Sequence, residues 1–450
     1  MSGVLNATTP LPAPGAAPMP QAVQVLGIDT PIGLALLREL AGHGLAVHGI
    51  ARSPRAIGLR ARALASGRVH APRDAALLAL LREQAARHGA WHLFAVSEND
   101  IAWLNRHREA LPGITLMMAD GPALARVLDK AAVYRVAAAL GIAVPTQWPV
   151  GSASQARRVA QRARYPVVVK WADPLRVADR LRALGLPLEK ARYCHAPDAL
   201  EALLSRCAAV GEYPLVQAQV PGEGLGQMLL MHRGRAVLRF QHRRLHEWPP
   251  EGGVSSCCEQ VDAGQHHALF AQSEALLRAL DWSGPAMVEY RHDPVSGRCV
   301  LMEVNGRYWG GYPLAEQAGA HFAWNHLRVT AGLPVSAGTG RASVRRCRFL
   351  VPDTRRLLRI LFAPQQIADR SLRWHPAREL WRYLVYPLGR GNRHYVFRWS
   401  DPLPCLADLA AIARSALARA AQALRRPRAL PAASPDDPAL ISRSAGTGRR

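Results

Sequence analysis

Along the first 120 residues, apolar runs typical of buried strands alternate with the mixed pattern of amphipathic helices. One apolar run covers residues 22–28 (AVQVLGI); a helical pattern and a second apolar run, Leu45–Ile50, follow it. Continuous apolar runs are typical of parallel strands buried on both faces, and strand, helix and strand together form a βαβ unit. A helix over residues 74–88 and a strand at His92–Val96 continue the alternation. The pattern predicts a Rossmann-like α/β domain over residues 21–124.

After residue 124 the expected strands are more often joined by short turns. A helix is expected over residues 125–141, and the β-branched run that ends at Lys170 (VVVK) predicts a strand. Further strands are expected between residues 227 and 241, and two more flank a turn at Asp293–Gly297. Strands joined by tight turns pair antiparallel. We therefore predict an α+β domain over residues 125–335.

Composition sets three further segments apart. Residues 1–20 carry no charge, no basic start and no long apolar core, which predicts a disordered leader and not a signal peptide. Residues 336–426 are rich in arginine and aromatic residues and end in an Ala/Leu/Arg helix. This region either packs on the catalytic lobes as an accessory region, which we favour, or makes peripheral contact with an anionic membrane. Residues 427–450 are expected to be disordered.

The formal net charge of +24 and the pI near 10.9 are typical of proteins that bind nucleic acid or anionic membranes. The arginines are nevertheless scattered through expected helices, without zinc-finger spacing or an RNA-binding aromatic signature, so we expect no nucleic-acid partner. Seven cysteines without a CxxC pair argue against a disulfide framework and a structural zinc site. The sequence contains no apolar run of about eighteen residues that could span a membrane. We expect a cytoplasmic protein.

Lysine is almost absent, and the surviving lysines lie in one stretch. Of 57 lysine and arginine residues, only Lys130, Lys170 and Lys190 are lysine. A lysine ammonium on a thin stem reaches a phosphate as a point charge, whereas arginine presents a planar fork. The clustering suggests a polyphosphate site; chance survival in an arginine-biased composition is the alternative for any one of them.

The first βα turn offers a second type of nucleotide site. Gly27 and Gly33 flank this turn, as glycines do in dinucleotide-binding domains. The three-glycine fingerprint is missing, however, and Ala51-Arg52 follows the second strand where an acidic ribose ligand is expected. An NAD-dependent oxidoreductase is therefore an alternative that we do not favour. The polar segment Ser97–Asp100 is expected to form a loop at the carboxyl end of a strand, where small ligands tend to bind.

Two glutamates follow neighbouring strands of an expected hairpin. Glu289 and Glu303 each end an apolar run, and Asn305 lies two residues beyond Glu303 on the same strand face. Two carboxylates and an amide oxygen are hard ligands suited to Mg²⁺ held with ATP phosphates. A pair of surface glutamates is the alternative. The lysines upstream and Arg307 downstream favour the metal site.

From about residue 22 to residue 335 the chain resembles the ATP-grasp superfamily, to which the ATP-binding fold of the carbamoyl-phosphate-synthase large chain belongs. The resemblance rests on Asp129-Lys130 with GIAVPT behind it, YPVVVK, LVQAQVPGEG and, most specifically, VEYRHDPVSGRCVLMEVNGRYWGG. It implies a Rossmann-like domain followed by a two-lobed ATP-grasp domain that grips ATP between two α+β lobes.

The resemblance also implies a nucleotide site. Lys130 and Lys170 would contact the ATP phosphates, and Glu223 would hold the ribose. Backbone groups of the segment 217–220 would line the adenine, which assigns this role to Gln217, Gln219 and Val220.

For the metal and the transferred group, the resemblance implies a second set of residues. Glu289, Glu303 and Asn305 would hold one or two Mg²⁺ ions. Arg307 would stabilise charge on the transferred phosphoryl group or on an acylphosphate.

Two features depart from the family pattern. Relatives often carry a glutamate next to the hinge glutamine, where this chain has Ala218. A glycine-rich lid is expected soon after the second lysine, yet Trp171–Glu189 contains only Gly185.

The segment His242–Gly253 is dense with polar groups and bounded by proline and glycine, which predicts a loop. It resembles an acceptor-facing loop found in a subgroup of carboxylate–amine ligases. Arg243 or Arg244 could clamp a substrate carboxylate bidentately, and we assign the role to Arg244. A solvated arginine loop is the alternative.

The leading hypothesis is an ATP- and Mg²⁺-dependent ligase that joins a small-molecule carboxylate to an amine through an acylphosphate intermediate. The alternative is an ATP-binding regulatory or scaffold protein that keeps the fold without ligase chemistry. The poor lid and Ala218 keep this alternative open.

Overall fold

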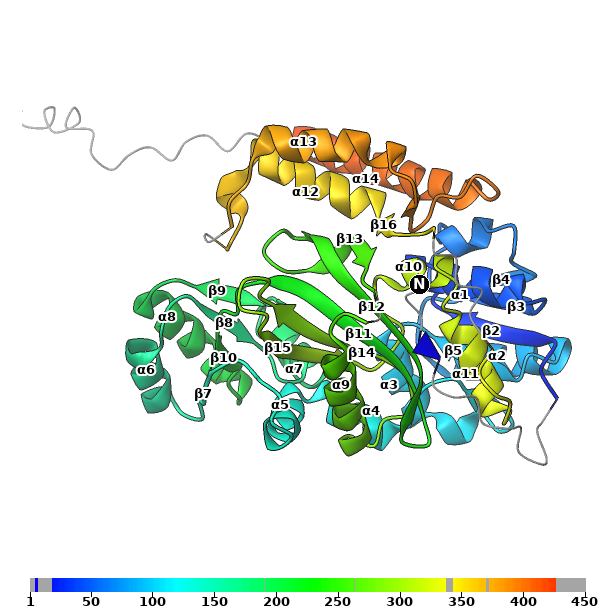
Figure 1. Ribbon diagram of the computed structural model, residues 1–450, viewed down its shortest axis with the longest axis horizontal. Coiled ribbons are helices and arrows are strands. Elements are labelled where there is room, and N and C mark those ends of the chain that lie inside the picture. Colours follow the sequence, from blue (N-terminus) through cyan, green and yellow to red (C-terminus); the bar gives the residue numbers. More distant parts are fainter. Residues whose placement is uncertain are drawn as a thin grey trace, which may run out of the picture. The chain divides into compact units, whose positions relative to one another are not determined.

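The computed structural model describes residues 5–6, 18–189, 191–262, 264–336, 343–369 and 372–425. Lys190, most of the expected leader and the expected tail lie outside these ranges. Contacts divide the chain into two units, Met1–Asp408 and Leu409–Arg450. The first unit is a mixed α/β structure built on three sheets (Figure 1).

The N-terminal sheet is parallel, with strand order β4-β3-β2-β5-β6. Its strands are β2 (Ala22–Leu26), β3 (Ala46–Ala51), β4 (Ser66–Val69), β5 (His92–Ala95) and β6 (Thr115–Leu116). The connecting helices are α1 (Pro31–Gly42), α2 (Ala75–His88) and α3 (Glu98–Arg106). The segment Ser97–Asp100, expected as a loop, begins α3. The Ser97 hydroxyl caps this helix by accepting a hydrogen bond from the Asp100 N–H.

A four-stranded antiparallel sheet of order β7-β10-β8-β9 forms a second layer, at the left of Figure 1. Its strands are β7 (Gln147–Trp148), β8 (Val167–Lys170), β9 (Arg192–Cys194) and β10 (Leu215–Ala218). Helices accompany it: α6 (Ala153–Arg162), α7 (Pro174–Ala183) and α8 (Pro197–Cys207). Val167 and Val169 alternate with their strand neighbours and pack on Leu200 and Leu204 of α8.

Two helices replace the single helix expected over residues 125–141. They are α4 (Gly121–Leu128) and α5 (Lys130–Ala139), separated by Asp129. Asp129 leaves the helical conformation, with ψ of 95°, and its carboxylate accepts hydrogen bonds from the N–H groups of Ala131 and Ala132. The aspartate is therefore the N-cap of α5, a role that competes with continuing a helix.

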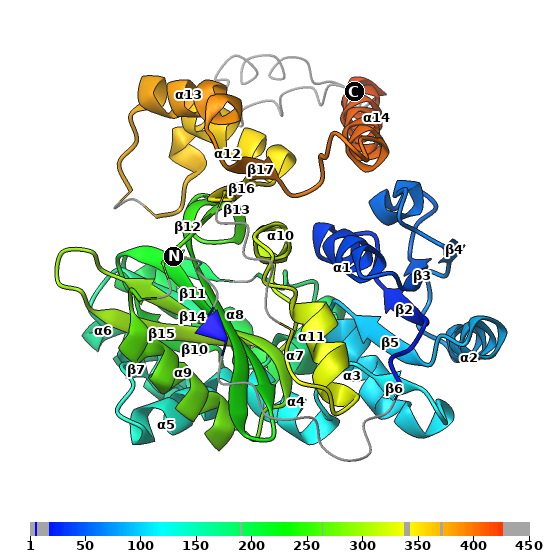
Figure 2. The same ribbon diagram turned by 45° about the vertical axis from the view of Figure 1, so that its right-hand side comes forward.

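The largest sheet has the order β15-β14-β11-β12-β13-β16-β17, and β1 (Leu5–Asn6) pairs with β12. Its long strands are β11 (Glu223–His232), β12 (Arg235–Trp248), β13 (Val254–Gln260), β14 (Gly284–His292) and β15 (Cys299–Asn305). Three helices accompany it: α9 (His267–Ala279), α10 (Tyr312–Gln317) and α11 (Phe322–Thr330). Figure 2 shows α10 and α11 between this sheet and α1.

The expectation of a loop over His242–Gly253 was wrong for its first half. Strand β12 continues to Trp248, which pairs with Val254 of β13. Polar side chains are tolerated there because they find partners across the strands, such as Glu259 opposite Arg243. The turn itself is therefore confined to residues 249–253.

The region after residue 342 extends the largest sheet. Its strands are β16 (Arg346–Arg348), antiparallel to β13, and β17 (Asn392–His394), parallel to β16. Its helices are α12 (Leu350–Phe362), α13 (Pro376–Val385) and α14 (Leu403–Arg425). Buried ion pairs join Arg38 to Asp401 at 2.9 Å and Arg356 to Glu379 at 2.7 Å. Up to Asp408 the region packs as part of the first unit.

Within the described residues, none of the helices is both long and apolar enough to cross a membrane. Peripheral membrane contact through residues 336–426 stays a prediction.

Candidate active site

Residues from the four-stranded sheet and the largest sheet line one cavity of about 530 Å³. Clefts of this size are typical of small-molecule sites. The cavity brings together all the residues predicted for the site except Glu223: Lys130, Lys170, Gln217, Gln219, Val220, Arg244, Glu289, Glu303, Asn305 and Arg307.

The two glutamates lie opposite each other because of the pairing of β14 with β15. Glu289 pairs with Glu303, and Asn305 pairs with Met287 two residue pairs further along the strands. The Asn305 amide donates to the Glu303 carboxylate at 3.3 Å. Directly opposite positions on an antiparallel pair are within side-chain contact distance. Two carboxylates and one amide oxygen therefore meet on one face of the sheet.

A β-bulge at Met302 turns β15 toward the cavity. The register shifts between Glu289 and Tyr290, so that Tyr290 pairs with Leu301 and Met302 is the extra residue. The Met302 carbonyl accepts hydrogen bonds from the Tyr134 hydroxyl at 2.6 Å and from Lys170 Nζ at 3.4 Å. The bulge thus lets Glu303 face the cavity while Leu301 stays in the core.

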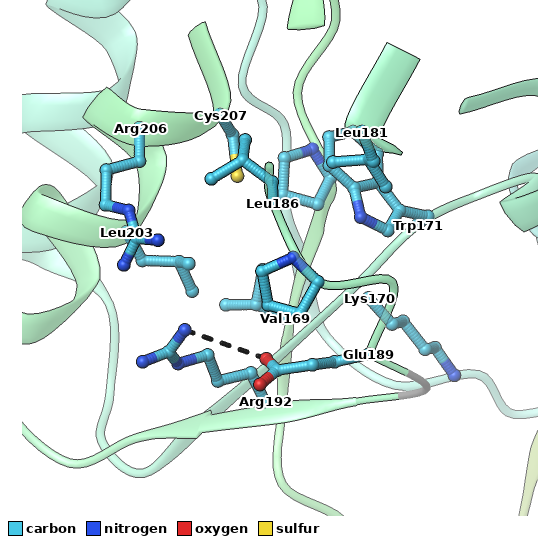
Figure 3. Close-up of a pocket in the computed structure, with 12 residues that line it drawn as sticks. Val169, Lys170, Trp171, Leu181, Leu186, Glu189, Arg192, Leu203, Arg206 and Cys207 are labelled. Carbon is cyan, nitrogen blue, oxygen red and sulfur yellow. Dashed lines mark ion pairs between the residues drawn. The ribbon is translucent and has the colours of Figure 1, made fainter. Parts of the chain in front are cut away.

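Two lysines approach this carboxylate pair from different elements. Lys130 is the first residue of α5, and its Nζ lies 3.8 Å from Glu303 Oε2. Lys170 is the last residue of β8 and is buried, with its Nζ 5.6 Å from the centre of the Tyr134 ring. Figure 3 shows the Lys170 side chain pointing away from the apolar cluster around Leu181 and Cys207.

That apolar cluster forms a separate small pocket of about 40 Å³ behind β8. At its mouth Arg192 pairs with Glu189 at 3.7 Å (Figure 3). A space of this size holds little more than one or two water molecules. It contributes packing behind the strand that ends in Lys170.

Arg307 connects Asn305, one of the candidate metal ligands, to Glu98 of the N-terminal domain. Its Nη2 donates to the Asn305 side-chain oxygen at 3.2 Å, and its Nε donates to Glu98 Oε1 at 3.0 Å. Glu98 is the first residue of α3, so the cavity wall includes the carboxyl end of the parallel sheet.

Arg244 is buried between two carboxylates. It donates to Glu289 and, at 3.2 Å, to Glu247. Burial alone lowers the pKa of Arg244, but the charges of Glu289 and Glu247 outweigh burial and raise the pKa above its ordinary value. The guanidinium is therefore a fixed positive charge against the carboxylate pair.

Arg243, the neighbouring residue, belongs to a different site. It pairs with Glu259 at 2.6 Å and with Glu223 at 3.7 Å. Glu223 and Arg243 line a separate groove of about 360 Å³. The structure therefore does not bring Glu223 together with the other predicted ribose and phosphate ligands.

The hinge supplies two glutamines to the cavity: Gln217 of β10, and Gln219 just after that strand ends. Gln217 is buried, and its side-chain oxygen accepts from the Tyr134 hydroxyl at 3.3 Å. Gln219 donates through its side chain to Asp369 at 2.6 Å. The backbone N–H of Ala218 donates to the Thr146 carbonyl at 2.8 Å, which ties the hinge to the segment after α5.

Tyr134 and Asp369 were not predicted from the sequence, and Glu98 was predicted only as part of the ligand-facing segment Ser97–Asp100. Tyr134 lies four residues after Lys130 on α5, and this helical spacing was a usable signal. Asp369 is buried, lines the cavity and comes from the region assigned to an accessory role. Its 150 residues of separation from Gln219 left no pattern in the sequence that could reveal the contact.

The segment Trp171–Glu189, where a glycine-rich lid was expected, is largely helical. Helix α7 begins after Asp173, whose carboxylate caps it through the N–H groups of Leu175 and Arg176. Leu175 lines the cavity. A capped helix therefore covers this edge in place of a glycine-rich loop.

A second cavity of about 350 Å³ shares Arg244, Glu303, Asn305 and Arg307 with the first. Its remaining walls include Thr30, the N-cap of α1, together with residues of the turn before β13 and of the segment before α10. It offers space for a second molecule beside the same charged groups.

The donor set fits Mg²⁺ together with a polyphosphate. Glu289, Glu303 and Asn305 offer oxygen atoms, which are the ligands that Mg²⁺ prefers. Lys130 and Lys170 supply positive charge beside them, as a polyphosphate requires. The residues present are therefore those that could hold Mg²⁺ and ATP.

A sequence comparison agrees with this geometry. Residues 254–337 match the family described as carbamoyl-phosphate synthase L chain, ATP binding domain. The matched stretch contains Glu289, Glu303, Asn305 and Arg307. No curated protein matched the chain.

Solved structures with similar folds include a biotin carboxylase from Campylobacter jejuni in a complex with β,γ-ATP. It has a TM-score of 0.55 and 14% identity, covering 70% of this chain and 72% of that one. The chain has the ATP-grasp fold.

Two further ATP-grasp structures are similar over about the same share of the chain. The biotin carboxylase domain of Hydrogenobacter thermophilus 2-oxoglutarate carboxylase, solved with MgADP, ADP and bicarbonate, has a TM-score of 0.54 and 15% identity, covering 70% of each chain. N5-carboxyaminoimidazole ribonucleotide synthetase from Thermus thermophilus has a TM-score of 0.53 and 20% identity, covering 71% of this chain and 80% of that one.

Proposed function

We propose that this ATP-grasp protein is an ATP- and Mg²⁺-dependent ligase that joins a carboxylate to an amine through an acylphosphate. The observation that carries the proposal is the Glu289–Glu303 pair on β14 and β15, in one cavity with Lys130, Lys170 and Arg307. The similar structures solved with β,γ-ATP and with MgADP and bicarbonate support the choice of nucleotide, metal and reaction class.

In this proposal the chain's own residues position and neutralise charge. Lys130 and Lys170 bind phosphate oxygens, and Arg307 stabilises the charge that develops on the transferred phosphoryl group. Glu289, Glu303 and Asn305 would hold Mg²⁺, which would supply positive charge against the phosphates. Gln217, Gln219 and Val220 line the adenine end of the cavity. Helix α7 and the hinge exclude water from the reactive acylphosphate.

The second cavity is the proposed acceptor site. It shares Arg244 and Arg307 with the nucleotide cavity, so an acceptor carboxylate bound there would lie next to the terminal phosphate. Its size admits a small molecule, and bicarbonate is among the acids to test because similar proteins bind it. The seven cysteines are free, which agrees with a reducing cytoplasm as the proposed compartment.

The test is ADP release from Mg-ATP in the presence of pooled carboxylates, including bicarbonate, and pooled amines. Release that requires a pool and is lost in Glu303→Ala supports the ligase. Glu223→Ala is the matched control, since that glutamate lies in the separate groove and its loss should leave release within about twofold of wild type. Nucleotide binding without release from any pool would favour the binding-only alternative.

A further inference from the structure

Two histidines and a cysteine meet on the opposite side of the hairpin from the carboxylate pair. His292 of β14 pairs with Cys299 of β15, and His266, directly before α9, lies beside them. One ligand atom from each of the three side chains lies within 4.8 Å of the other two. The imidazole rings of His266 and His292 meet edge to face, with their centres 4.7 Å apart.

The alternation of β14 separates this cluster from the ATP cavity. Glu289 and Arg291 line the cavity, whereas the Tyr290 hydroxyl hydrogen-bonds Ser273 of α9 at 2.9 Å. Successive strand residues point to opposite faces, so His292 lies on the α9 face with Tyr290. The bulge at Met302 puts Cys299 and Leu301 on that face as well.

The backbone at His266 is held in an unusual conformation. His266 has a φ of 57° in the left-handed region, which a residue with a β-carbon adopts at a cost. This conformation occurs at the N-cap of α9, where the side chain makes no capping hydrogen bond. The turn therefore brings the imidazole to His292 and does not use it to cap the helix.

We propose that His266, His292 and Cys299 form a binding site for a divalent transition metal, with Zn²⁺ the best fit. Two imidazoles and one thiolate match the ligands of three-residue zinc sites that keep a fourth position open. Zinc bonds of about 2.0–2.3 Å require ligand atoms roughly 3.3–3.6 Å apart, so each side chain needs to move by about 1 Å or less.

The surroundings allow both binding and a fourth ligand. Both histidines line the groove of about 360 Å³, which also includes Asp262. A carboxylate oxygen or a water molecule can complete the coordination there.

A metal at this position would join α9 to the strands that carry Glu289 and Glu303. The histidines and the cysteine come from three elements, and spacings of 26 and 7 residues form no sequence motif for zinc. We expected no structural zinc site because the sequence has no CxxC pair. The site proposed here has two histidines and one cysteine as ligands and therefore needs no such pair. The site is independent of the proposed ligase activity.

Cobalt spectroscopy of the full chain tests the site directly. After metal removal, Co²⁺ is expected to bind one to one at this site with a thiolate-to-cobalt absorption band in the near ultraviolet, and Zn²⁺ is expected to displace it. The oxygen ligands of the ATP cavity give no such band. Cys299→Ser should abolish the band, and His292→Ala should weaken Co²⁺ affinity by about 100-fold or more, beyond the ~10–100-fold effects of outer ligands.

Cys207→Ser is the matched thiol control, since Cys207 is buried at the end of α8 and packs against Trp171 and Leu181, and it should keep the band. Thermal unfolding checks that each variant folds. A band that persists in Cys299→Ser, the absence of a thiolate band, or binding that needs millimolar Co²⁺ would overturn the proposal.

Discussion

Glu289 is the proposed metal ligand that contacts Arg244, a residue that lines both cavities. Arg244 holds its carboxylate from the buried side, and Glu303 faces it across the strand pair. The buried guanidinium offsets part of the negative charge that two adjacent carboxylates and a polyphosphate would otherwise concentrate. Removing the charge of any one of these three side chains should therefore change how the other two bind their partners.

Arg244→Ala should lower ADP release by about 100-fold, or about 2.7 kcal/mol in transition-state free energy. The reason is that Glu289 would lose its buried partner, and the proposed acceptor cavity would lose the positive charge of Arg244. Arg243→Ala, one residue earlier, removes an exposed pair with Glu259 and should change release by less than twofold. Steady-state kinetics with a thermal unfolding check measures both. Equal effects of the two substitutions would contradict this assignment.

Asp369 gives a second prediction for a single residue. Its carboxylate accepts from Gln219 at the hinge, so Asp369→Ala should loosen the adenine end and raise KM for ATP by about tenfold, at little cost in kcat. Asp179→Ala, an exposed aspartate on α7, is the control. A fall in kcat with KM unchanged would argue that Asp369 acts elsewhere.

Among the elements, the break between α4 and α5 sets the position of Lys130. Asp129→Ala removes the N-cap and should destabilise the fold by about 0.5–2 kcal/mol while raising KM for ATP. Asp129→Ser keeps a capping oxygen, so it should restore most of the lost stability and bring KM for ATP most of the way back. Denaturant unfolding and ATP kinetics test this pair. An alanine variant with normal stability and KM would show that the cap does not position the lysine.

The strands that carry the site could be predicted from the sequence, whereas several boundaries could not. Glu289 and Glu303 follow apolar runs joined by a turn, and local patterning is enough to place them on paired strands. The end of β12 was missed because its polar side chains are satisfied by partners across the sheet, which a local pattern does not contain. The helix break at Asp129 had a local signal, since aspartate favours N-caps, but an uninterrupted apolar pattern outweighed it.

At the scale of the first unit, buried polar contacts hold distant segments together. Glu39 of α1 accepts hydrogen bonds from the Tyr312 hydroxyl at 2.5 Å and from the Trp324 N–H at 2.9 Å. Arg38, the preceding residue, pairs with Asp401. Such contacts join the parallel sheet to α10, α11 and the C-terminal segment. Sequence patterning could not predict them, as it could not predict Asp369, because the partners lie 150 or more residues apart.

Glu39 makes stability depend on pH. Burial raises its pKa to about 8, above the ordinary value of 4.5. Between these pH values the folded state keeps a proton that the unfolded state releases, so the free energy of unfolding falls as pH rises and levels off above about 8. Glu39→Gln should remove this slope. Denaturant unfolding at pH 5 to 9 measures the free energy of unfolding of wild type and of Glu39→Gln. If the two proteins show the same dependence on pH, Glu39 is not its source.

The most direct test of the central claim is calorimetric binding of a non-hydrolysable ATP analogue, with and without Mg²⁺, to wild type and Glu303→Ala. We expect binding to wild type to weaken at least tenfold, about 1.4 kcal/mol, when Mg²⁺ is omitted, and binding to Glu303→Ala to be the same with and without Mg²⁺. Undetectable binding, or equal binding with and without Mg²⁺ in both proteins, would contradict a Mg-ATP site built on the Glu289–Glu303 pair.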